Sequence, residues 1–403
     1  MSVLYISYDG MLEPLGQSQV LAYLKRLAAG RKIHLISFEK SDDWKKCTER
    51  RLLSADIAHA GIVWHPLRYH KRPSALATLW DIVCGIAVGL WLVVRYRLAI
   101  VHARSYVASV MALVLKRLTG VKFLFDMRGF WADERIDGGM WLAGGRLYRV
   151  AKWFERHFLL HADYVVSLTQ AAVDEMRTFP YLQGNMPPFE VITTCADLDL
   201  FRPAQVDSLP NQIDRHFTLG YVGSVGVWYL FDETLRCFKF LRELLPDARL
   251  LVFNRGGHDY IRERMQIMNV SPDTVQIEEA DHAGVARAMQ RMDAGIFIIK
   301  PVYSKMASAP TKLGEFLGCG VPCLGNSGVG DMAAILENEQ VGVALSRFDD
   351  DAMREAIERL LQLTQTAGIK ERCREVALRY FSLDEGVAAY QKIYCQRIRA
   401  QSK

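Results

Sequence analysis

The feature that most constrains the fold is a regular alternation of short, apolar, β-branched runs with longer stretches of helical pattern. The runs cover residues 2–7, 32–39, 61–67, 98–105, 122–129, 162–169 and 189–195, and then 217–224, 248–256, 274–279, 294–301, 321–326 and 342–345. Strands that alternate with helices form parallel sheets covered by helices on both faces. The pattern therefore predicts an α/β fold, and 403 residues are enough for two doubly wound, Rossmann-like domains.

The polar segment 196–214, which contains two prolines, interrupts the alternation and is predicted to be an interdomain linker. We expect an N-terminal domain over residues 1–205 and a C-terminal domain over residues 206–383. A last helix within 384–403 could pack back on the first domain. If the two sheets face one another, the carboxyl ends of their strands border a cleft, which is the usual ligand-binding edge of such sheets.

The cysteines and the charge distribution indicate the cellular compartment and the class of partner. Eight cysteines are scattered without a CxxC pair, which is typical of reduced thiols in a cytosolic protein rather than of disulfides or a zinc site. The start of the sequence shows no signal-peptide pattern, so we expect a cytoplasmic protein. Residues 1–205 hold 26 lysines and arginines against 19 acidic residues, a net +7. This excess favours an anionic partner, either phosphate groups or a membrane surface; a merely basic surface is the alternative.

An uncharged apolar run covers residues 82–94 and follows the basic stretch 68–73. Its 13 residues are fewer than the roughly 20 that span a bilayer, so we expect a crossover helix buried against the sheet. Trp80, Trp91 and the basic flank also suit a headgroup interface, and the two interpretations are compatible. Four residues are candidates for contact with an acceptor or with the anionic inner face of the cell membrane. They are Arg68, Lys71, Arg72 and, after a later predicted strand, Trp131.

The stretch SAPTKLGEFLGCGVPCLG, residues 308–325, has the chemistry of an anion site at a helix start. Pro310 suits a first helical turn, and Ser308 or Thr311 can serve as the N-cap. The free N–H groups and the helix dipole attract an anion, and Lys305 and Lys312 add charge suited to a diphosphate. Glu315, one turn further on, can accept hydrogen bonds from a ribose diol. An ordinarily capped helix with an acidic residue is the alternative.

Polar side chains also follow predicted strands of the first domain. The set comprises His102, Arg104, Asp126, Arg128, Trp131, Asp133 and Glu134. At the carboxyl edge of a sheet such a cluster favours a functional site, with surface or capping roles as the alternative. The loop DGMLEPLGQSQ, residues 9–19, lacks GxGxxG, so dinucleotide binding is not indicated; it is either a phosphate-approaching loop or a tight βα turn. Arg255 could reach a phosphate or cap a loop.

The stretch 308–331 resembles the donor-nucleotide motif of the family 4 glycosyltransferases, which have the GT-B fold. In that family two glutamates separated by seven residues hold the sugar nucleotide. Glu315 corresponds to the second, ribose-binding glutamate, whereas Ala307 stands in the place of the first. We expect Lys305 or Ser308 to replace it in holding the sugar hydroxyls.

The resemblance extends over nearly the whole chain. Residues 10–28 are similar to the family's first glycine loop and helix, 196–201 to its interdomain segment, and 219–229 to its first strand and loop in the second domain. The resemblance implies that the nucleotide sugar is bound by Gly16, Gln17, Gly223, Ser224, Arg255, Lys305, Ser308, Thr311, Lys312, Leu313 and Glu315. By the same resemblance the catalytic set is Arg104, His102, Asp126 and Arg128, with Arg104 in the place of a histidine usual for the family.

The resemblance implies a retaining hexosyltransferase of bacterial exopolysaccharide or envelope synthesis. It would move a sugar from a UDP- or GDP-linked donor to a hydroxyl of a glycan or a lipid-linked acceptor. We expect no cofactor and no metal, because lysines, arginines and helix starts hold the leaving diphosphate in GT-B enzymes; the DLD at 197–199 lies in the expected linker. No nucleic acid partner is expected. The alternatives are a sugar-nucleotide epimerase of the same fold and a non-catalytic subunit that binds nucleotides.

Overall fold

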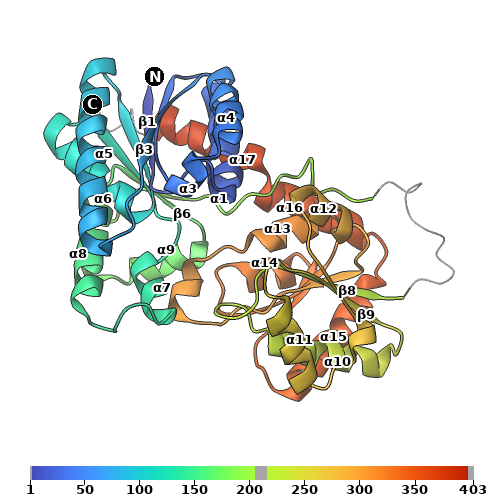
Figure 1. The fold of residues 1–403 in the computed structure, drawn as a ribbon. Helices are drawn as coiled ribbons and strands as arrows, with labels where there is room; N and C mark the ends of the chain where they lie inside the picture. The colour runs from blue at the N-terminus through green and yellow to red at the C-terminus, as the bar shows by residue number, and fades with distance from the viewer. Residues whose placement is uncertain (1, 205–215, 398–403) are drawn as a thin grey trace. The chain divides into compact units, whose positions relative to one another are not determined.

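The computed structural model describes residues 2–204 and 216–397, which form two compact units (Figure 1). The first unit comprises Met1–Ile192 and Leu383–Lys403, and the second comprises Thr193–Ser382. The chain thus leaves the first unit once and returns to it with α17 (Leu383–Lys392).

Within the described residues, the first unit is built on a seven-stranded sheet in which every strand pair is parallel. Its order is β3-β2-β1-β4-β5-β6-β7. The strands are β1 (Val3–Ser7), β2 (Ile33–Glu39), β3 (Ile62–Arg68), β4 (Ile100–Arg104), β5 (Lys122–Asp126), β6 (Tyr164–Ser167) and β7 (Phe189–Val191). Strands β1, β2 and β4 are buried along their whole length, as expected for strands covered on both faces.

Helices of the first unit pack on this sheet. Three of them, α5 (Ser74–Tyr96), α6 (Ser105–Thr119) and α8 (Arg146–His161), form a contiguous row because α6 contacts both of the others. Helix α17 packs on α2 (Ala22–Ala28). The remaining helical segments are α1 (Pro14–Gly16), a π-helical turn (Gln17–Leu21), α3 (Ser41–Trp44), α4 (Cys47–His59), α7 (Trp131–Asp137), α9 (Gln170–Arg177), a 3-10 turn (Pro180–Leu182) and a second π-helical turn (Ile393–Arg397).

The second unit repeats the plan with a six-stranded parallel sheet in its described part, in the order β10-β9-β8-β11-β12-β13. The strands are β8 (Thr218–Val222), β9 (Arg249–Phe253), β10 (Val275–Glu278), β11 (Ala294–Ile296), β12 (Cys323–Asn326) and β13 (Gly342–Leu345). The helices are α10 (Phe231–Leu244), α11 (His258–Ile267), α12 (His282–Met289), α13 (Thr311–Gly318), α14 (Met332–Asn338), α15 (Asp350–Thr364) and α16 (Ile369–Phe381), with 3-10 turns at Pro272–Thr274 and Tyr303–Ala307.

The boundary between the units comes earlier than the expected residue 205. Ala196 forms a parallel bridge with Ser382, and its N–H donates to the carbonyl of Phe381 at 2.9 Å. Leu198 and Phe201 are buried in the core of the second unit. Residues 193–204 therefore belong to that unit, whereas the rest of the expected linker, 205–214, lies outside the described residues, as do 398–403 of the expected last helix.

Helix α5 is longer than its uncharged run suggested. Residues Ala75–Tyr96 are long and apolar enough to cross a membrane by length and composition, and 33% of an apolar 18-residue stretch within them is buried. The expectation that the segment is too short is therefore wrong, because the helix continues on both sides of 82–94. The expected burial against the sheet holds for one face only.

The inner face of α5 is fitted closely to the unit. Asp81 is fully buried and accepts hydrogen bonds from the hydroxyl of Tyr8 and the backbone N–H of His70. A Cβ on Gly85 or Gly89 would lie 2.4 or 2.8 Å from the ends of side chains of α6, so the two glycines let α5 pack closely on α6. The outer face is a stripe of exposed apolar side chains at helical spacing: Leu76, Leu79, Trp80, Val83, Trp91 and Val94.

Candidate active site

Two neighbouring strands of the first sheet end in charged residues. Arg104 is the last residue of β4 and Asp126 is the last residue of β5. Arg128 follows β5 by two residues, so all three side chains belong to the carboxyl edge, where parallel sheets bind ligands. The residue after β4, Ser105, and Arg128 have φ values of 66° and 59°. Left-handed backbone costs a non-glycine residue about 1–2 kcal/mol. Strained residues at two adjacent strand ends mark this edge as a candidate functional site.

The charges at this edge are buried but loosely paired. Arg104 Nε lies 3.6 Å from Asp9 Oδ2, and Arg128 Nη1 lies 4.0 Å from Asp126 Oδ1. Both separations exceed hydrogen-bond distance, and Asp126 Oδ1 is buried without a hydrogen-bond partner among the described residues. The two guanidinium groups are therefore not saturated by these carboxylates.

The sequence predicts His102 at the carboxyl edge, but this expectation is wrong. His102 sits in the middle of β4, its exposed fraction is 1%, and its ring is 4.3 Å from the ring of Tyr5. Its Nε2 lies 3.4 Å from Asp126 Oδ2 and its Nδ1 lies 2.5 Å from the hydroxyl of Tyr394. Because a carboxylate only accepts, Nε2 carries the proton and Nδ1 accepts from Tyr394. Both nitrogens are occupied, so His102 positions Asp126 and does not face a substrate.

Two tyrosines from the returning segment complete this network. The hydroxyl of Tyr390, in α17, donates to Asp126 Oδ2 at 3.1 Å, and Tyr394, in the following turn, bonds His102. Tyr390 and Tyr394 are four residues apart and thus share one helix face. The segment after residue 382 is part of the wall of the candidate site.

The electrostatics of the cluster favour an anionic ligand. Burial alone would raise the pKa of Asp126, but Arg128 and His102 hold it below its ordinary value, so the group is a carboxylate. Burial lowers the pKa of His102, which is neutral at pH 7. Arg104 and Arg128 are then two buried or nearly buried positive charges against one buried negative charge, since Asp9 is half exposed. The excess charge suits a phosphate or carboxylate.

The first glycine loop is built at the same edge. Glu39, buried at the end of β2, accepts from the backbone N–H groups of Met11 and Leu12 at 2.8 and 3.2 Å. A Cβ on Gly16 would lie 2.1 Å from the carbonyl oxygen of Gly10, so Gly16 is a close-packing position. Gln17 is exposed.

Trp131, Asp133 and Glu134 lie in α7, which begins three residues after Arg128. The indole of Trp131 is half buried and packs 5.2 Å from the ring of Trp141. Asp133 faces inward to Tyr148 and Lys152 at 2.8 and 3.0 Å. Trp131 thus remains beside the edge, whereas Asp133 serves the packing of the helices.

The carboxyl edge of the second sheet carries the predicted donor-binding residues. Gly223 follows β8 with φ 146°, a conformation that favours glycine, and its carbonyl accepts from the amide of Asn254 at 2.8 Å. Ser224, next to it, is exposed. Arg255 is also exposed, and its guanidinium donates to the carbonyl of Ala280 at 3.0 Å, so in this structure it caps a loop.

Helix α13 starts differently from the prediction. Its N-cap is Pro310, and neither Ser308 nor Thr311 makes a side-chain cap hydrogen bond in the described structure. Proline has no N–H to satisfy and no side-chain oxygen to offer the first turn, so the first N–H groups of α13 have no capping side chain of their own. Leu313 is buried in the core of the second unit.

Lysines and a glutamate surround this helix start. Lys312 Nζ lies 2.9 Å from Glu315 Oε2, so the two charges are paired one turn apart. The side chain of Glu315 is 4% exposed, and a ligand could reach it only at the base of the site. Lys305 is buried, with its Nζ 3.8 Å from the centre of the Trp228 ring. Ala307 is buried and has no polar atom to hold a sugar hydroxyl.

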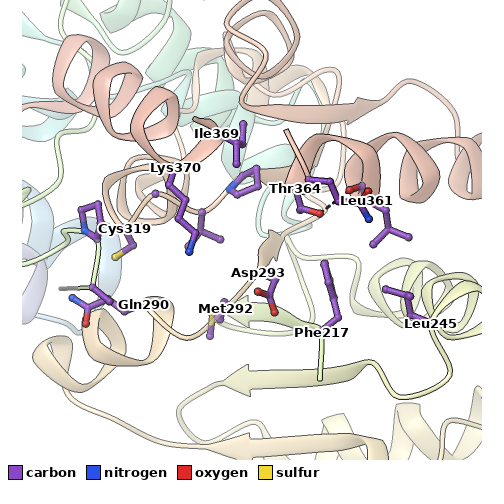
Figure 2. Close-up of a pocket in the computed structure, with 16 residues that line it drawn as sticks. Phe217, Leu245, Gln290, Met292, Asp293, Cys319, Leu361, Thr364, Ile369 and Lys370 are labelled. Atoms are coloured by element: carbon purple, nitrogen blue, oxygen red, sulfur yellow. Dashed lines mark hydrogen bonds between the residues drawn. The ribbon is translucent and has the colours of Figure 1, made fainter. Parts of the chain in front are cut away.

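A cavity of about 200 Å³ lies elsewhere in the second unit (Figure 2). Its lining includes Phe217, Asp293 and Pro322, which precede β8, β11 and β12, and it therefore opens at the amino edge of the sheet. This is the edge opposite to Gly223 and Glu315. The cavity does not coincide with the candidate donor site.

The sequence interpretation missed several residues of both edges. Tyr390, Tyr394 and Asp9 support the first cluster, and Trp228 and Asn254 support the second. The spacing of Tyr390 and Tyr394 was a visible signal, but their partners lie 264 and 292 residues away in sequence. In the part of the chain that the structure describes, no group of three or more His, Cys, Asp or Glu side chains is placed to hold a metal ion.

Comparisons with known proteins agree with this architecture. Residues 19–184 match the family model of the glycosyl transferase 4-like domain. A glycosyltransferase from Rickettsia africae is 14% identical with a TM-score of 0.71 over 98% of each chain. Sucrose-phosphate synthase from Thermosynechococcus elongatus is 15% identical with a TM-score of 0.69 over 99% of each chain. Anabaena HepE in complex with UDP and glucose is 13% identical with a TM-score of 0.68, over 98% of this chain and 99% of HepE. A search of curated protein sequences found no match.

The two parallel sheets form the GT-B fold of these solved structures, and residues 19–184 match a glycosyl transferase 4-like domain. The match over residues 19–184 and the motif around Glu315 both agree with the resemblance to the family 4 glycosyltransferases that the sequence indicated. The resemblance inferred from the sequence is thereby confirmed.

Burial of neutral His102 predicts a dependence of stability on pH. The unfolded chain takes up a proton here below about pH 6.5, the ordinary value, whereas the folded chain does not because burial lowers the pKa of His102. The free energy of unfolding should therefore fall as pH drops below about 6.5, by up to about 1.4 kcal/mol per pH unit from this group. Urea unfolding of His102→Gln should show a shallower decline than the wild type. Burial lowers the pKa of His34 to about 4 and also lowers that of His65. Both histidines are present in the wild type and in the variant, so their contributions cancel in the comparison. Equal slopes of the free energy of unfolding against pH in the two proteins would contradict the assignment.

Proposed function

We propose that the protein is a retaining glycosyltransferase that moves a hexose from a UDP- or GDP-linked donor to a hydroxyl of a glycan or lipid-linked acceptor. The setting would be bacterial exopolysaccharide or envelope glycolipid synthesis. The observation that carries the proposal is the placement of Glu315, Lys312 and Lys305 around the uncapped start of α13, at the carboxyl edge of the second sheet. The UDP and glucose in the HepE complex support a nucleotide-sugar donor.

The donor-side chemistry follows from these residues. The first N–H groups of α13 and the charge of Lys305 would stabilise the diphosphate as it leaves. Glu315 would accept hydrogen bonds from the ribose diol, with Lys312 orienting its carboxylate. With Ala307 in place of a glutamate, the sugar hydroxyls would be held by Ser308, which is half buried, or by Lys305.

The first-unit cluster would act on the charge that develops in the reaction. A guanidinium does not release its proton, so Arg104 and Arg128 are not general bases. They would hold an anionic oxygen, either of the leaving diphosphate or of a carboxylate on donor or acceptor, by two-pronged hydrogen bonds. In this mechanism the bond between the sugar and the diphosphate breaks first. The acceptor hydroxyl then attacks the same face of the sugar and passes its proton to the departing diphosphate, so no protein nucleophile is required. That no metal is needed stays a prediction.

The proposal includes contact of α5 with an anionic membrane. The exposed stripe from Leu76 to Val94 contains Trp80 and Trp91, which suit a headgroup boundary. Arg68, Lys71 and Arg72 are exposed just before the helix, and the described structure gives none of them an ion-pair partner. The buried Asp81 and the packed glycines keep α5 on the unit, so the helix would lie in the interface plane, on the cytoplasmic side of the membrane.

A screen of sugar nucleotides by thermal shift tests the donor assignment. A ligand at 100 times its dissociation constant adds about 2.7 kcal/mol to stability. Glu315→Ala should weaken binding of the donor and of the free UDP or GDP alike by about 1.5–3 kcal/mol, because charged hydrogen bonds are lost. Glu355→Ala, an exposed carboxylate on α15, is the control. A folded Glu315→Ala protein with unchanged nucleotide affinity would contradict the assignment of Glu315. Analysis of the reaction products distinguishes sugar transfer from epimerisation and from nucleotide binding without reaction.

Removal of the buried guanidinium should affect the chemical step. Arg104→Ala should lower kcat by ~100-fold or more while leaving nucleotide affinity nearly intact, because charge stabilisation is needed most in the transition state. Arg104→Lys should rescue poorly, since an ammonium group cannot reproduce a bidentate contact. Arg117→Ala, exposed on α6, is the control. A raised KM with kcat untouched would make Arg104 a binding residue, and normal kinetics would remove it from the site.

The membrane contact of α5 should depend on charge. Arg72→Glu should weaken binding to phosphatidylcholine vesicles that contain phosphatidylglycerol by about 1 kcal/mol or more, because each basic residue near an anionic surface contributes about that much. Co-sedimentation at low and high salt measures the effect, with Arg262→Glu in the second unit as the matched control. Binding that is absent at low salt, or equal in the two variants, would count against this contact.

A further inference from the structure

The loop 138–145, between α7 and α8, presents apolar side chains to solvent. Its sequence is GGMWLAGG, with a glycine pair at each end of an apolar tip. Leu142 is 84% exposed, the highest value among the exposed large apolar side chains of the described residues, and Met140 is also exposed. Side chains of this kind at a loop tip gain nothing by staying in water.

The loop is held in one shape by its backbone. The N–H groups of Met140 and Trp141 both donate to the carbonyl of Arg135, at 2.9 and 3.0 Å, and Gly145 donates to Leu142 at 2.9 Å. Gly139 and Gly144 have φ values of 70° and 69°, where a larger residue would be strained. The tip is therefore a fixed projection: Trp141 packs on Trp131 of α7, whereas Met140 and Leu142 do not fold back into the unit.

The outer face of α8 continues this surface. Leu147, Val150 and Trp153 follow at three-residue intervals, so they lie along one side of the helix, and all three are exposed. Arg146 and Arg149 are exposed beside them, and the described structure gives neither an ion-pair partner. Apolar residues with tryptophan next to unpaired arginines are complementary to an anionic bilayer surface.

The inner face of α8 is anchored by buried charges. Lys152 bridges Asp133 at 3.0 Å and Glu155 at 2.5 Å, and Glu155 also accepts from Tyr106. Glu155 is fully buried. Breaking a buried network of this kind is costly, so α8 cannot rotate to hide its outer face without losing it.

We propose that the loop 138–145 and the outer face of α8 insert into the headgroup region of an anionic lipid bilayer, as a membrane contact separate from α5, and that a lipid-linked acceptor enters the site beside them. The link to the site is Trp131, which packs on Trp141 of the loop and follows Arg128 by three residues. The part that concerns the acceptor rests on the proposed function; the part that concerns the membrane does not.

Vesicle co-sedimentation of the whole chain tests the contact. Met140→Ser/Leu142→Ser should bind phosphatidylcholine–phosphatidylglycerol vesicles about tenfold more weakly than the wild type, because several buried methylene groups are lost. Arg146→Glu/Arg149→Glu should also weaken binding about tenfold or more, and only when phosphatidylglycerol is present. Both losses should persist in a Trp80→Ser/Trp91→Ser background, which removes part of the α5 contact.

The controls use the second unit. Ile267→Ser/Leu378→Ser replaces two exposed apolar side chains there, and Arg262→Glu reverses an exposed charge; both should bind vesicles like the wild type. Three results would overturn the proposal. The Met140/Leu142 variant could bind vesicles as well as the wild type, or the controls could lose as much binding as that variant. The variant could also convert a dimer to a monomer while the protein binds no vesicles. Thermal shift with UDP and GDP separates the two hypotheses: nucleotide binding without vesicle binding refutes this inference alone, and vesicle binding without any nucleotide shift refutes the proposed function and the acceptor route with it.

Discussion

Every hydrogen-bonded strand pair in the two described sheets is parallel, and the candidate chemistry depends on this constraint. Parallel strands need helical connections that cover both faces, so polar groups can collect only at the edges. In the first unit Arg104 and Asp126 end adjacent strands and are register partners in the β4–β5 pairing. In the second unit β8 and β11 are neighbours, and the loops that follow them hold Gly223 and Lys305. One architectural rule thus produces two charged edges from unrelated sequences.

Each edge solves the problem of a buried charge in its own way. Asp126 accepts a hydrogen bond from the hydroxyl of Tyr390. Burial would raise its pKa, but Arg128 and the ring of His102 hold the pKa below the ordinary value. Glu315 is paired with Lys312 at one-turn spacing on the same helix. The first solution draws on residues distant in sequence and the second is entirely local. Neither leaves a carboxylate buried without compensation, which would cost several kcal/mol.

The same difference explains what could be predicted from the sequence. Each of the apolar runs overlaps a strand of the described structure, because strand runs and their turn residues are local signals. The position of Glu315 one turn after Lys312 was readable for the same reason. The burial of His102 was not, because it depends on Tyr394 far along the chain. The cap of α13 was misjudged because a proline occupies the position where a hydroxyl was expected. The extent of α5 was underestimated because the charged and polar residues at its ends were counted as breaks, whereas Asp81 is satisfied inside the unit.

The return of the chain to the first unit has a consequence for the order in which the protein is made. The strands that carry Arg104 and Asp126 leave the ribosome long before α17, since Tyr390 follows Asp126 by 264 residues. Until that segment emerges, the first unit has its sheet but lacks the hydroxyl groups that Asp126 and His102 use. The second unit, by contrast, is one continuous segment with its two ends paired at Ala196 and Ser382. Synthesis therefore completes the second unit first, and the buried charges of the first unit acquire their partners only afterwards.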